Sequence, residues 1–385
     1  MGLKGYFLTQ KYMQIKIKQT LTLLILSIFF VSCSGDDNPI IPDDDTPIEV
    51  SPVVFDLNAV PYPKLSDYNF FKSPMQNMEP VYGVLPFQPA SQLFTDYAEK
   101  KRFLWMPEGV SATFQGDDKI LNFPVGAVLI KNFYYKNVLP SHTQKIIETR
   151  LMIRKAEGWI FANYVWNDEQ TEALHTSNGG VVPITWMHNG VEKSIEYRIP
   201  NDGQCFMCHY LNNQNMPLGP KPQNMNFPIN FADGSINQLE KFKNFGYLNG
   251  EIPTSISSTV DYNDTSKSLD LRARSYLDMN CGSCHRTGGY AEFYPVRFNY
   301  TPDANYDQLG FCLEPNINIH GLDPNSIGAD HIIYASDFTK SIIYYRMNTE
   351  QENIKMPMIG RSIIHNEGVQ LISNWINSFP EQNCD

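Results

Sequence analysis

The first half of the chain alternates hydrophobic and polar side chains with a period of two. Between residues 147 and 154, apolar or threonine side chains occupy the odd positions and mostly charged side chains the even ones. This alternation predicts strands with one buried face. Asn189-Gly190 predicts a hairpin, because both residues accept the positive φ of a type I′ turn. Residues 54–200 are therefore expected to form a mostly antiparallel β domain, which also holds a short helix opening at Ser91.

The second half changes to helical spacing. Inward-facing side chains recur at intervals of three and four over 266–280 and again over 366–379, which predicts two amphipathic helices. A third helix is expected around 237–245. The last helix is expected to be capped by Asn366 and to stop at Pro380, since proline cannot continue it.

A Cys-x-x-Cys-His pentad occurs twice, at 205–209 and 281–285. In this pattern two thiols one helical turn apart add to the vinyl groups of a porphyrin, and the adjacent histidine ligates the iron. With 7 Cys and 8 His in the chain, two copies are hard to attribute to chance. The alternative is a structural zinc site built from two CxxC pairs, which the spacing alone permits.

The sequence thus predicts two covalent haem c groups. The residues expected to hold them are the cysteines Cys205, Cys208, Cys281 and Cys284, with the proximal iron ligands His209 and His285. Residues 201–265 would form the first haem-binding segment, and 266–385 a cytochrome c-like domain with the second haem. The expected fold class is α+β: a mostly antiparallel β N-terminal domain followed by an all-α, cytochrome c-like haem region.

Methionines are the candidate distal ligands, because a thioether is a soft ligand for haem iron. For the second haem, Met356 is expected in preference to Met358, since Met followed by Pro just ahead of a terminal helix resembles the ligand loop of class I cytochromes c. For the first haem, Met216 and Met225 are candidates, a residue of the β domain is another, and an empty position is the remaining alternative.

The N-terminus carries an export signal. Residues 1–32 combine four lysines with an apolar stretch, and Phe30-Val31-Ser32-Cys33 resembles a bacterial lipobox in which Cys33 is lipidated. Residues 33–53 are rich in Asp and Pro and are expected to form a tether. The expected location is the outer membrane or cell surface, with the periplasmic face as an alternative; an ordinary secretory signal would also export the chain.

Charge narrows the range of partners. The formal charge of the chain is -11, and removal of the four lysines in 1–32 leaves 26 basic against 41 acidic residues, or about -15. Nucleic acid is therefore excluded as an expected partner, because phosphate binding needs a basic face. An acidic protein suits docking to a basic patch on a redox partner. Of the seven cysteines, Cys312 and Cys384 have no role in the lipid or haem sites, and they would either form a disulfide or stay free.

Longer motifs resemble a family of exported, dihaem c-type cytochromes with a β-rich N-terminal half. They are LFTDYAEKKRFLWMPEG (93–109), FPVGAVLIKNFYY (123–135), IETRLMI (147–153), NYVWND (163–168), IPNDGQCFMCH (199–209) and LRARSYLDMNCGSCH (271–285). The resemblance covers about residues 55–380 and implies haem-binding roles for the two pentads. It supplies no substrate.

Three functions follow from these observations. The leading hypothesis is electron transfer between a redox partner and the respiratory chain, rather than a stand-alone enzyme activity. A dihaem peroxidase or oxidase with one five-coordinate haem is the first alternative. The second is a surface binding module with an accessory haem domain, in which an aromatic face of the β domain would recognise a partner. That face would be made of Trp159, Tyr164, Trp166 and Trp186, which fill a β-sheet core in the structural alternative.

Replacement of Cys33 tests the export signal. Because the lipid is expected on the Cys33 thiol, Cys33→Ser should abolish lipid labelling and release soluble protein. Metabolic labelling with a fatty acid and membrane fractionation measure both effects. Unchanged membrane association in the variant would show that another anchor exists.

Overall fold

The structure is a computed structural model that describes residues 49–315, 327–382 and 384. Val50–Asp385 forms one compact unit. The expected signal peptide, Cys33 and almost all of the tether lie outside the described residues. Within the described ranges, no helix combines the length and apolar character needed to cross a membrane.

The N-terminal half is dominated by strands. Their bounds are β1 Leu85–Phe87, β2 Glu99–Trp105, β3 Ala112–Thr113, β4 Val128–Val138, β5 Thr143–Lys155, β6 Gly158–Trp166, β7 Ala173–Thr176, β8 Gly180–His188 and β9 Val191–Ile199. Two 3-10 turns precede them, η1 Leu65–Tyr68 and η2 Met75–Asn77. After β9 the strands are much shorter: β10 Tyr210–Leu211, β11 Gln214–Asn215, β12 Pro228–Phe231, β13 Gly234–Asn237 and β14 Leu248–Asn249.

Helices are short and lie mainly in the second half. They are α2 Asp202–Cys208, α3 Pro222–Met225, α4 Gln238–Asn244, α5 Leu269–Asn280, α6 Tyr306–Leu309, η3 Phe338–Lys340, α8 Ile342–Met347 and α9 Asn366–Asn377. The sequence predicted α4, α5 and α9 to within a few residues, because their spacing and cap residues are local signals. The side chain of Ser268 caps α5. The expected cap of the last helix is wrong: Asn366 is the first residue of α9, and His365 before it is the N-cap.

One large antiparallel sheet organises the fold. Its strand order is β1-β2-β4-β5-β6-β7, with β8 pairing with β4 and β9 with β8. The β8–β9 turn has φ angles of 49° at Asn189 and 79° at Gly190, as the expected hairpin requires. The antiparallel β prediction for the N-terminal half is therefore confirmed.

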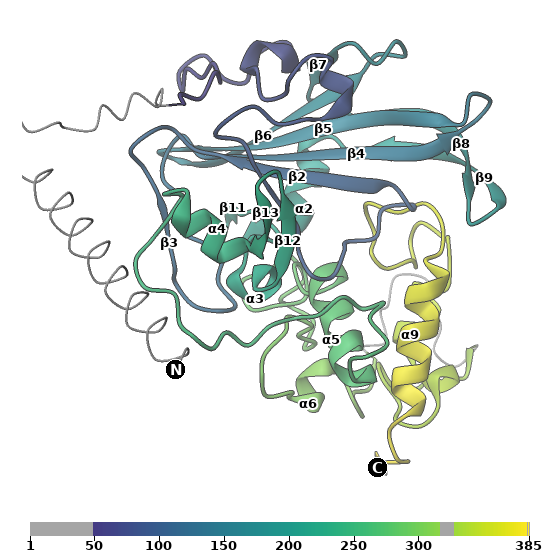
Figure 1. The fold of residues 1–385 in the computed structure, drawn as a ribbon. Coiled ribbons are helices and arrows are strands. Elements are labelled where there is room, and N and C mark those ends of the chain that lie inside the picture. The colour runs from purple at the N-terminus through teal and green to yellow at the C-terminus, as the bar shows by residue number, and fades with distance from the viewer. Residues whose placement is uncertain (1–48, 316–326, 383, 385) are drawn as a thin grey trace, which may run out of the picture. The chain divides into compact units, whose positions relative to one another are not determined.

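Both faces of the sheet are covered (Figure 1). One face packs under the segment before β1, in a core that includes Leu65, Tyr68, Leu151 and Tyr164. The other face packs against the region of α3, α4 and β14, in a second core whose members include Leu104, Leu129, Met152, Met225 and Phe242. This second face continues into a row of charged side chains, which the strand pattern points inward rather than to solvent.

The expected all-α, cytochrome c-like haem region is wrong. The fold is mostly β, and in the described part of 201–385 helices alternate with two-stranded hairpins and long loops. The two predicted helices do form and touch: Trp375 Nε1 of α9 donates to Asp270 Oδ1 of α5 at 3.0 Å. In the chain between α5 and α9, however, the backbone N–H and C=O groups bond largely to one another across loops. One such bond runs from the Arg297 N–H to the Gln308 carbonyl oxygen at 2.7 Å. Two amphipathic helices therefore did not imply a helical domain.

The short helix expected at Ser91 is also absent. Asp96 and Tyr97 adopt positive φ angles of 50° and 62°, which end any helix there. The Asp96 carboxylate accepts the backbone N–H groups of Ser362 and Ile363 at 2.6 and 3.1 Å. A tertiary contact with the segment before α9 thus overrides the local helical pattern.

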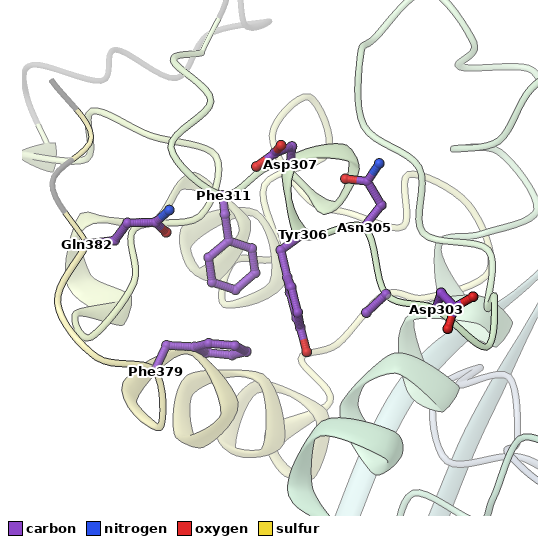
Figure 2. Close-up of a pocket in the computed structure, with 8 residues that line it drawn as sticks. Asp303, Asn305, Tyr306, Asp307, Phe311, Phe379 and Gln382 are labelled. Carbon is purple, nitrogen blue, oxygen red and sulfur yellow. The ribbon is translucent and has the colours of Figure 1, made fainter.

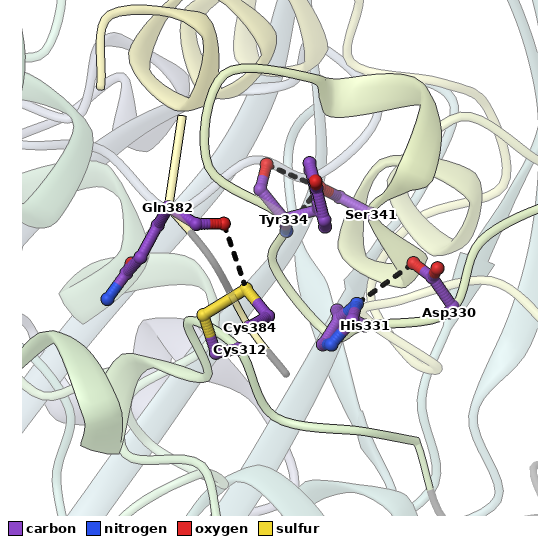
Figure 3. The surroundings of a disulfide bond; sticks show 7 residues. All are labelled: Cys312, Asp330, His331, Tyr334, Ser341, Gln382 and Cys384. Carbon is purple, nitrogen blue, oxygen red and sulfur yellow. Dashed lines mark hydrogen bonds and ion pairs between the residues drawn. A yellow bond between two sulfur atoms is a disulfide. The ribbon is translucent and has the colours of Figure 1, made fainter. Parts of the chain in front are cut away.

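Cys312 and Cys384 form a disulfide, with their Cα atoms 5.0 Å apart (Figure 3). The bond joins the loop after α6 to the C-terminal tail, so the chain end is tied beside the loop that contains His331. Of the two alternatives that the sequence left open, the structure has the paired one.

A buried ion pair anchors α5. Lys221 Nζ lies 2.8 Å from both carboxylate oxygens of Asp278, and their side chains are 10% and 2% exposed. Asp278 Oδ1 also accepts the Tyr300 N–H at 2.9 Å. Because removal of one partner strands a buried charge, Lys221→Met should lower the free energy of unfolding by about 3–5 kcal/mol.

The matched control for this prediction is Lys72→Met. Lys72 pairs with Glu79 at 2.6 Å, but the two side chains are 57% and 58% exposed. Loss of an exposed pair should cost less than about 1 kcal/mol. Urea denaturation measures both variants, and equal destabilisation would contradict the role of the buried pair.

Candidate functional site

The first pentad lies at the end of a capped helix. Asn201 caps α2, because its side-chain oxygen accepts the Gln204 N–H at 2.9 Å. The Gln204 side-chain oxygen in turn accepts the Asn201 N–H, which completes a capping box. Cys205 is buried within α2, Cys208 ends it, and His209 follows as the C-cap. Local sequence thus places two thiols one turn apart, with the histidine directly behind them.

The ring of His209 is fixed in one tautomer. Its Nδ1 lies 2.8 Å from the carbonyl oxygen of Met216, which can only accept, so Nδ1 carries the proton. The Nε2 lone pair is therefore free to bind a metal. Burial, followed by the positive charges of Lys131 and Arg150, lowers the pKa of His209 to about 4 and keeps the imidazole neutral.

The second pentad continues α5. Cys281 is the C-cap of that helix, and the His285 N–H bonds the Cys281 carbonyl at 3.0 Å. Gly282 is required, because a Cβ there would lie 2.7 Å from the Asp278 carbonyl oxygen and 3.0 Å from the backbone of Asn299. The backbone of the pentad therefore packs directly against the backbone of α5 at Asp278 and against the backbone at Asn299.

The ring of His285 is partly buried, and its Nδ1 atom is enclosed. Its Nδ1 has no hydrogen-bond partner among the described residues. Burial, followed by the charges of Arg346 and Arg297, lowers the pKa of His285 to about 4. Phe298 stands edge-on to the ring, with centroids 5.5 Å apart. Both pentad histidines are thus neutral imidazoles, the form that ligates metals.

The two pentads meet in space. Interaction with the Cys208 thiol lowers the pKa of the Cys284 thiol to about 7. The sulfur of Cys284 also lies 3.5 Å from the carbonyl oxygen of Met207. Behind them the Asn212 N–H bonds the Gly288 carbonyl at 2.9 Å. Segments far apart in the chain therefore form a single site, which no spacing rule could have shown.

The geometry does not gather the thiols into a zinc site. All four pentad cysteines are free and described, yet no group of three or more Cys, His, Asp or Glu in the described ranges is arranged to hold a metal ion. A structural zinc site needs about four such ligands around one point. The residues fit two haem groups better, since each pentad offers two free thiols and a neutral imidazole with an open nitrogen.

The structure separates the two candidate ligands of the second haem. Met356 is half-buried, and its N–H bonds the carbonyl of Arg346 at 2.8 Å. Arg346 is one of the cations that act on His285. Met358 is 46% exposed. Met356 is therefore the less exposed of the two candidates, whereas Met358 is open to solvent.

Neither candidate for the first haem is placed as a distal ligand. Met216 bonds His209 through both its N–H and its carbonyl, on the Nδ1 side of the ring, which faces away from the metal position. Met225 is 0% exposed and packs in the second core with Leu239 and Phe242. The structure brings Met216 to the pentad, but behind the histidine.

The aromatic face proposed for a binding module does not exist as a surface. Trp159, Tyr164, Trp166 and Trp186 are all buried, with exposed fractions of 7% or less. They fill the cores on the two sides of the sheet. The core interpretation of these side chains is the one that the structure supports.

Sequence reasoning missed the cationic side of this site. On β5, Arg150 Nε donates to Glu148 Oε2 at 2.8 Å. The structure adds Lys100, Arg102 and Lys131 to the same face. The sequence did carry a signal for this cluster: charged residues stand at strand positions that alternation assigns to the buried face of the sheet.

A separate groove lies beside the C-terminal tail (Figure 2). It has a volume of about 610 Å³, and the rings of Tyr306, Phe311 and Phe379 point into it. Asp303 and Asp307 stand at its rim. None of the pentad residues lines it, so it forms no part of the thiol and histidine site.

Comparison with known proteins gives no further guide to the site. No protein-family model matches the chain, and neither the curated proteins nor the solved structures contain a match. The functional argument therefore depends on the chain's own residues.

Single replacements of the two methionines test the distal ligand. If the Met356 sulfur holds the sixth position, Met356→Ala should leave both haems attached, lower the potential of the second haem and admit carbon monoxide, since a thioether ligand raises the potential. Met358→Ala is the matched control and should change little. Near-infrared absorption and redox titration measure the effects. Loss of the methionine-to-iron band in Met358→Ala alone would shift the assignment by two residues.

Proposed function

We propose that this protein is an exported, lipid-anchored dihaem c-type cytochrome that transfers electrons between a redox partner and the respiratory chain. The observation that carries the proposal is the contact between the two CxxCH pentads, where the Cys284 sulfur lies 3.5 Å from the Met207 carbonyl oxygen. Two redox centres attached at touching segments are close enough to exchange electrons within one molecule. The proposal agrees with the cytochrome family that the sequence resembles.

The chemistry of each pentad supports covalent haem. When bound, the haem iron supplies a one-electron redox couple. Cys205, Cys208, Cys281 and Cys284 would hold the two groups as thioethers. His209 and His285 would supply the proximal nitrogens. The protein's own contribution is to keep both imidazoles neutral and oriented, which the Met216 carbonyl does for His209.

Export and partner follow from the sequence. The lipidated Cys33 would tether the folded unit to a membrane, and the net charge of about -15 for the processed chain favours a partner with a basic docking patch. Such docking weakens as salt rises, because the Debye length falls to about 3 Å at 1 M ionic strength.

A second candidate function is a dihaem peroxidase or oxidase. It is supported by one observation: the Met216 carbonyl bonds the Nδ1 side of His209 and Met225 is fully buried in the second core, which favours an open sixth position on the first haem. A five-coordinate iron there would accept a small ligand. Spectra of the resting protein separate the two functions, since two low-spin irons support transfer and one high-spin iron supports the enzyme.

Haem counting tests the proposed function. Expressed with a haem c maturation system, the wild-type chain should carry two covalent haems, seen by haem staining of a denaturing gel and by intact mass. Cys205→Ala/Cys208→Ala should carry one, because each pentad holds its own group. The control Cys312→Ala/Cys384→Ala removes two cysteines from the disulfide instead and should keep both haems. A wild-type protein with one haem, or with zinc alone, would contradict the dihaem assignment.

A further inference from the structure

Four strands of the sheet align a row of cations on one face. The register pairs Arg102 of β2 with Lys131 of β4, Lys131 with Arg150 of β5, and Arg150 with Asn163 of β6. Paired residues of an antiparallel sheet point to the same face. Lys100 lies two residues before Arg102 on β2 and shares that face. We call Lys100, Arg102, Lys131 and Arg150 the cationic row.

The cationic row carries more positive than negative charge. Its four cations face one carboxylate, that of Glu148, which leaves a formal excess of three positive charges. Glu148 is 0% exposed and is engaged by Arg150 and by the Tyr197 hydroxyl at 2.7 Å. Asp96, another acid near Lys100, is occupied by backbone N–H groups. The excess stands out in a chain whose total charge is -11.

None of Lys100, Arg102 and Lys131 forms an ion pair with a carboxylate of the described residues, and Arg102 is the most deeply buried of the three. Its side chain is 7% exposed, its Nη1 has no hydrogen-bond partner, and no carboxylate of the described residues forms an ion pair with it. Burial lowers its pKa to about 10. A buried guanidinium without an anion costs several kcal/mol of folding free energy, so its presence indicates an anion to be bound.

The cationic row lies against the first pentad. Asn163, at the end of the register row, donates to the Pro200 carbonyl at 3.0 Å and lies 3.8 Å from the Cys205 sulfur. Phe161, two residues before Asn163 on the same face of β6, lies edge-on to the His209 ring with the ring centroids 5.3 Å apart. An anionic group attached at Cys205 and Cys208 would therefore meet the row directly.

We propose that the cationic row binds the propionate carboxylates of the haem attached at the first pentad, with Arg102 as the principal partner. This inference rests on the proposed function. A haem c carries two propionates, and the planar fork of an arginine matches a carboxylate with two parallel hydrogen bonds. The row thus supplies the counter-charge that lets an anionic cofactor enter a buried site.

The test compares Arg102→Met with Arg198→Met as the matched control. Arg198 is on β9, is 60% exposed and pairs with Glu352, so its loss removes the same charge from an exposed position of the same sheet. Both variants should carry two haems. In Arg102→Met the midpoint potential of one haem should fall, because a cation no longer offsets the propionate charge. The propionate pKa, read from the pH dependence of that potential, should rise by about 1–3 units.

Redox titrations from pH 5 to pH 9 distinguish the outcomes. Coincident curves for Arg102→Met and wild type, with both haems attached, overturn the propionate assignment alone. A wild-type chain without covalent haem overturns the proposed function and this assignment with it. If Arg102→Met does not fold, Lys131→Met is measured in its place, with the same expected fall in potential and the same overturning result.

A free anion is the other source of the same chemistry. Phosphate and succinate are therefore titrated into the haem-loaded wild type and into Arg102→Met. With propionates on the cationic row, neither anion should shift the potential in an Arg102-dependent way. A saturable shift in wild type that is lost in Arg102→Met would assign the row to a diffusible anion and overturn the propionate assignment.

Discussion

The central constraint on this structure is the burial of positive charge on one face of the β sheet. Three cations that strand pairing sets side by side repel one another, and each loses hydration, so the fold tolerates them only where an anion can compensate. Glu148 compensates Arg150, while Arg102 is left without a carboxylate among the residues described. The face toward the first pentad is therefore built for something other than stability.

The rest of the chain holds the two pentads against this face. α2 brings the first pentad to β6 through Asn163, and α5 brings the second to the first through Cys284. α5 itself is held by Asp278, whose carboxylate is shared between Lys221 and the Tyr300 N–H. The buried pair thus contributes to the site as well as to the core, because a shift of α5 would separate the pentads.

The neutral state of the two histidines has the same physical origin. Both rings are partly buried, and positively charged side chains act on both, so protonation is disfavoured twice. A neutral imidazole is what metal ligation requires. The positive charge that we propose binds the haem carboxylates therefore also favours the ligating form of His209.

Local signals in the sequence determined the strands, the Asn189-Gly190 hairpin, α5 and α9, since periodicity and turn chemistry act over a few residues. They also determined the candidate chemistry, because a CxxCH pentad is contiguous. The all-α region and the helix at Ser91 were wrong for the converse reason: contacts such as Asp96 with Ser362 are made by residues distant in the chain.

The tertiary structure alone decided which segments meet. Strand parity shows that Arg102, Lys131 and Arg150 each share a face with inward residues, but only the register places them in one row. Likewise, the spacing within each pentad predicts a haem, but only the fold puts Cys208 beside Cys284. The sequence by itself therefore determined the groups that carry the chemistry. Their assembly into one site depends on long-range packing, which no local pattern encodes.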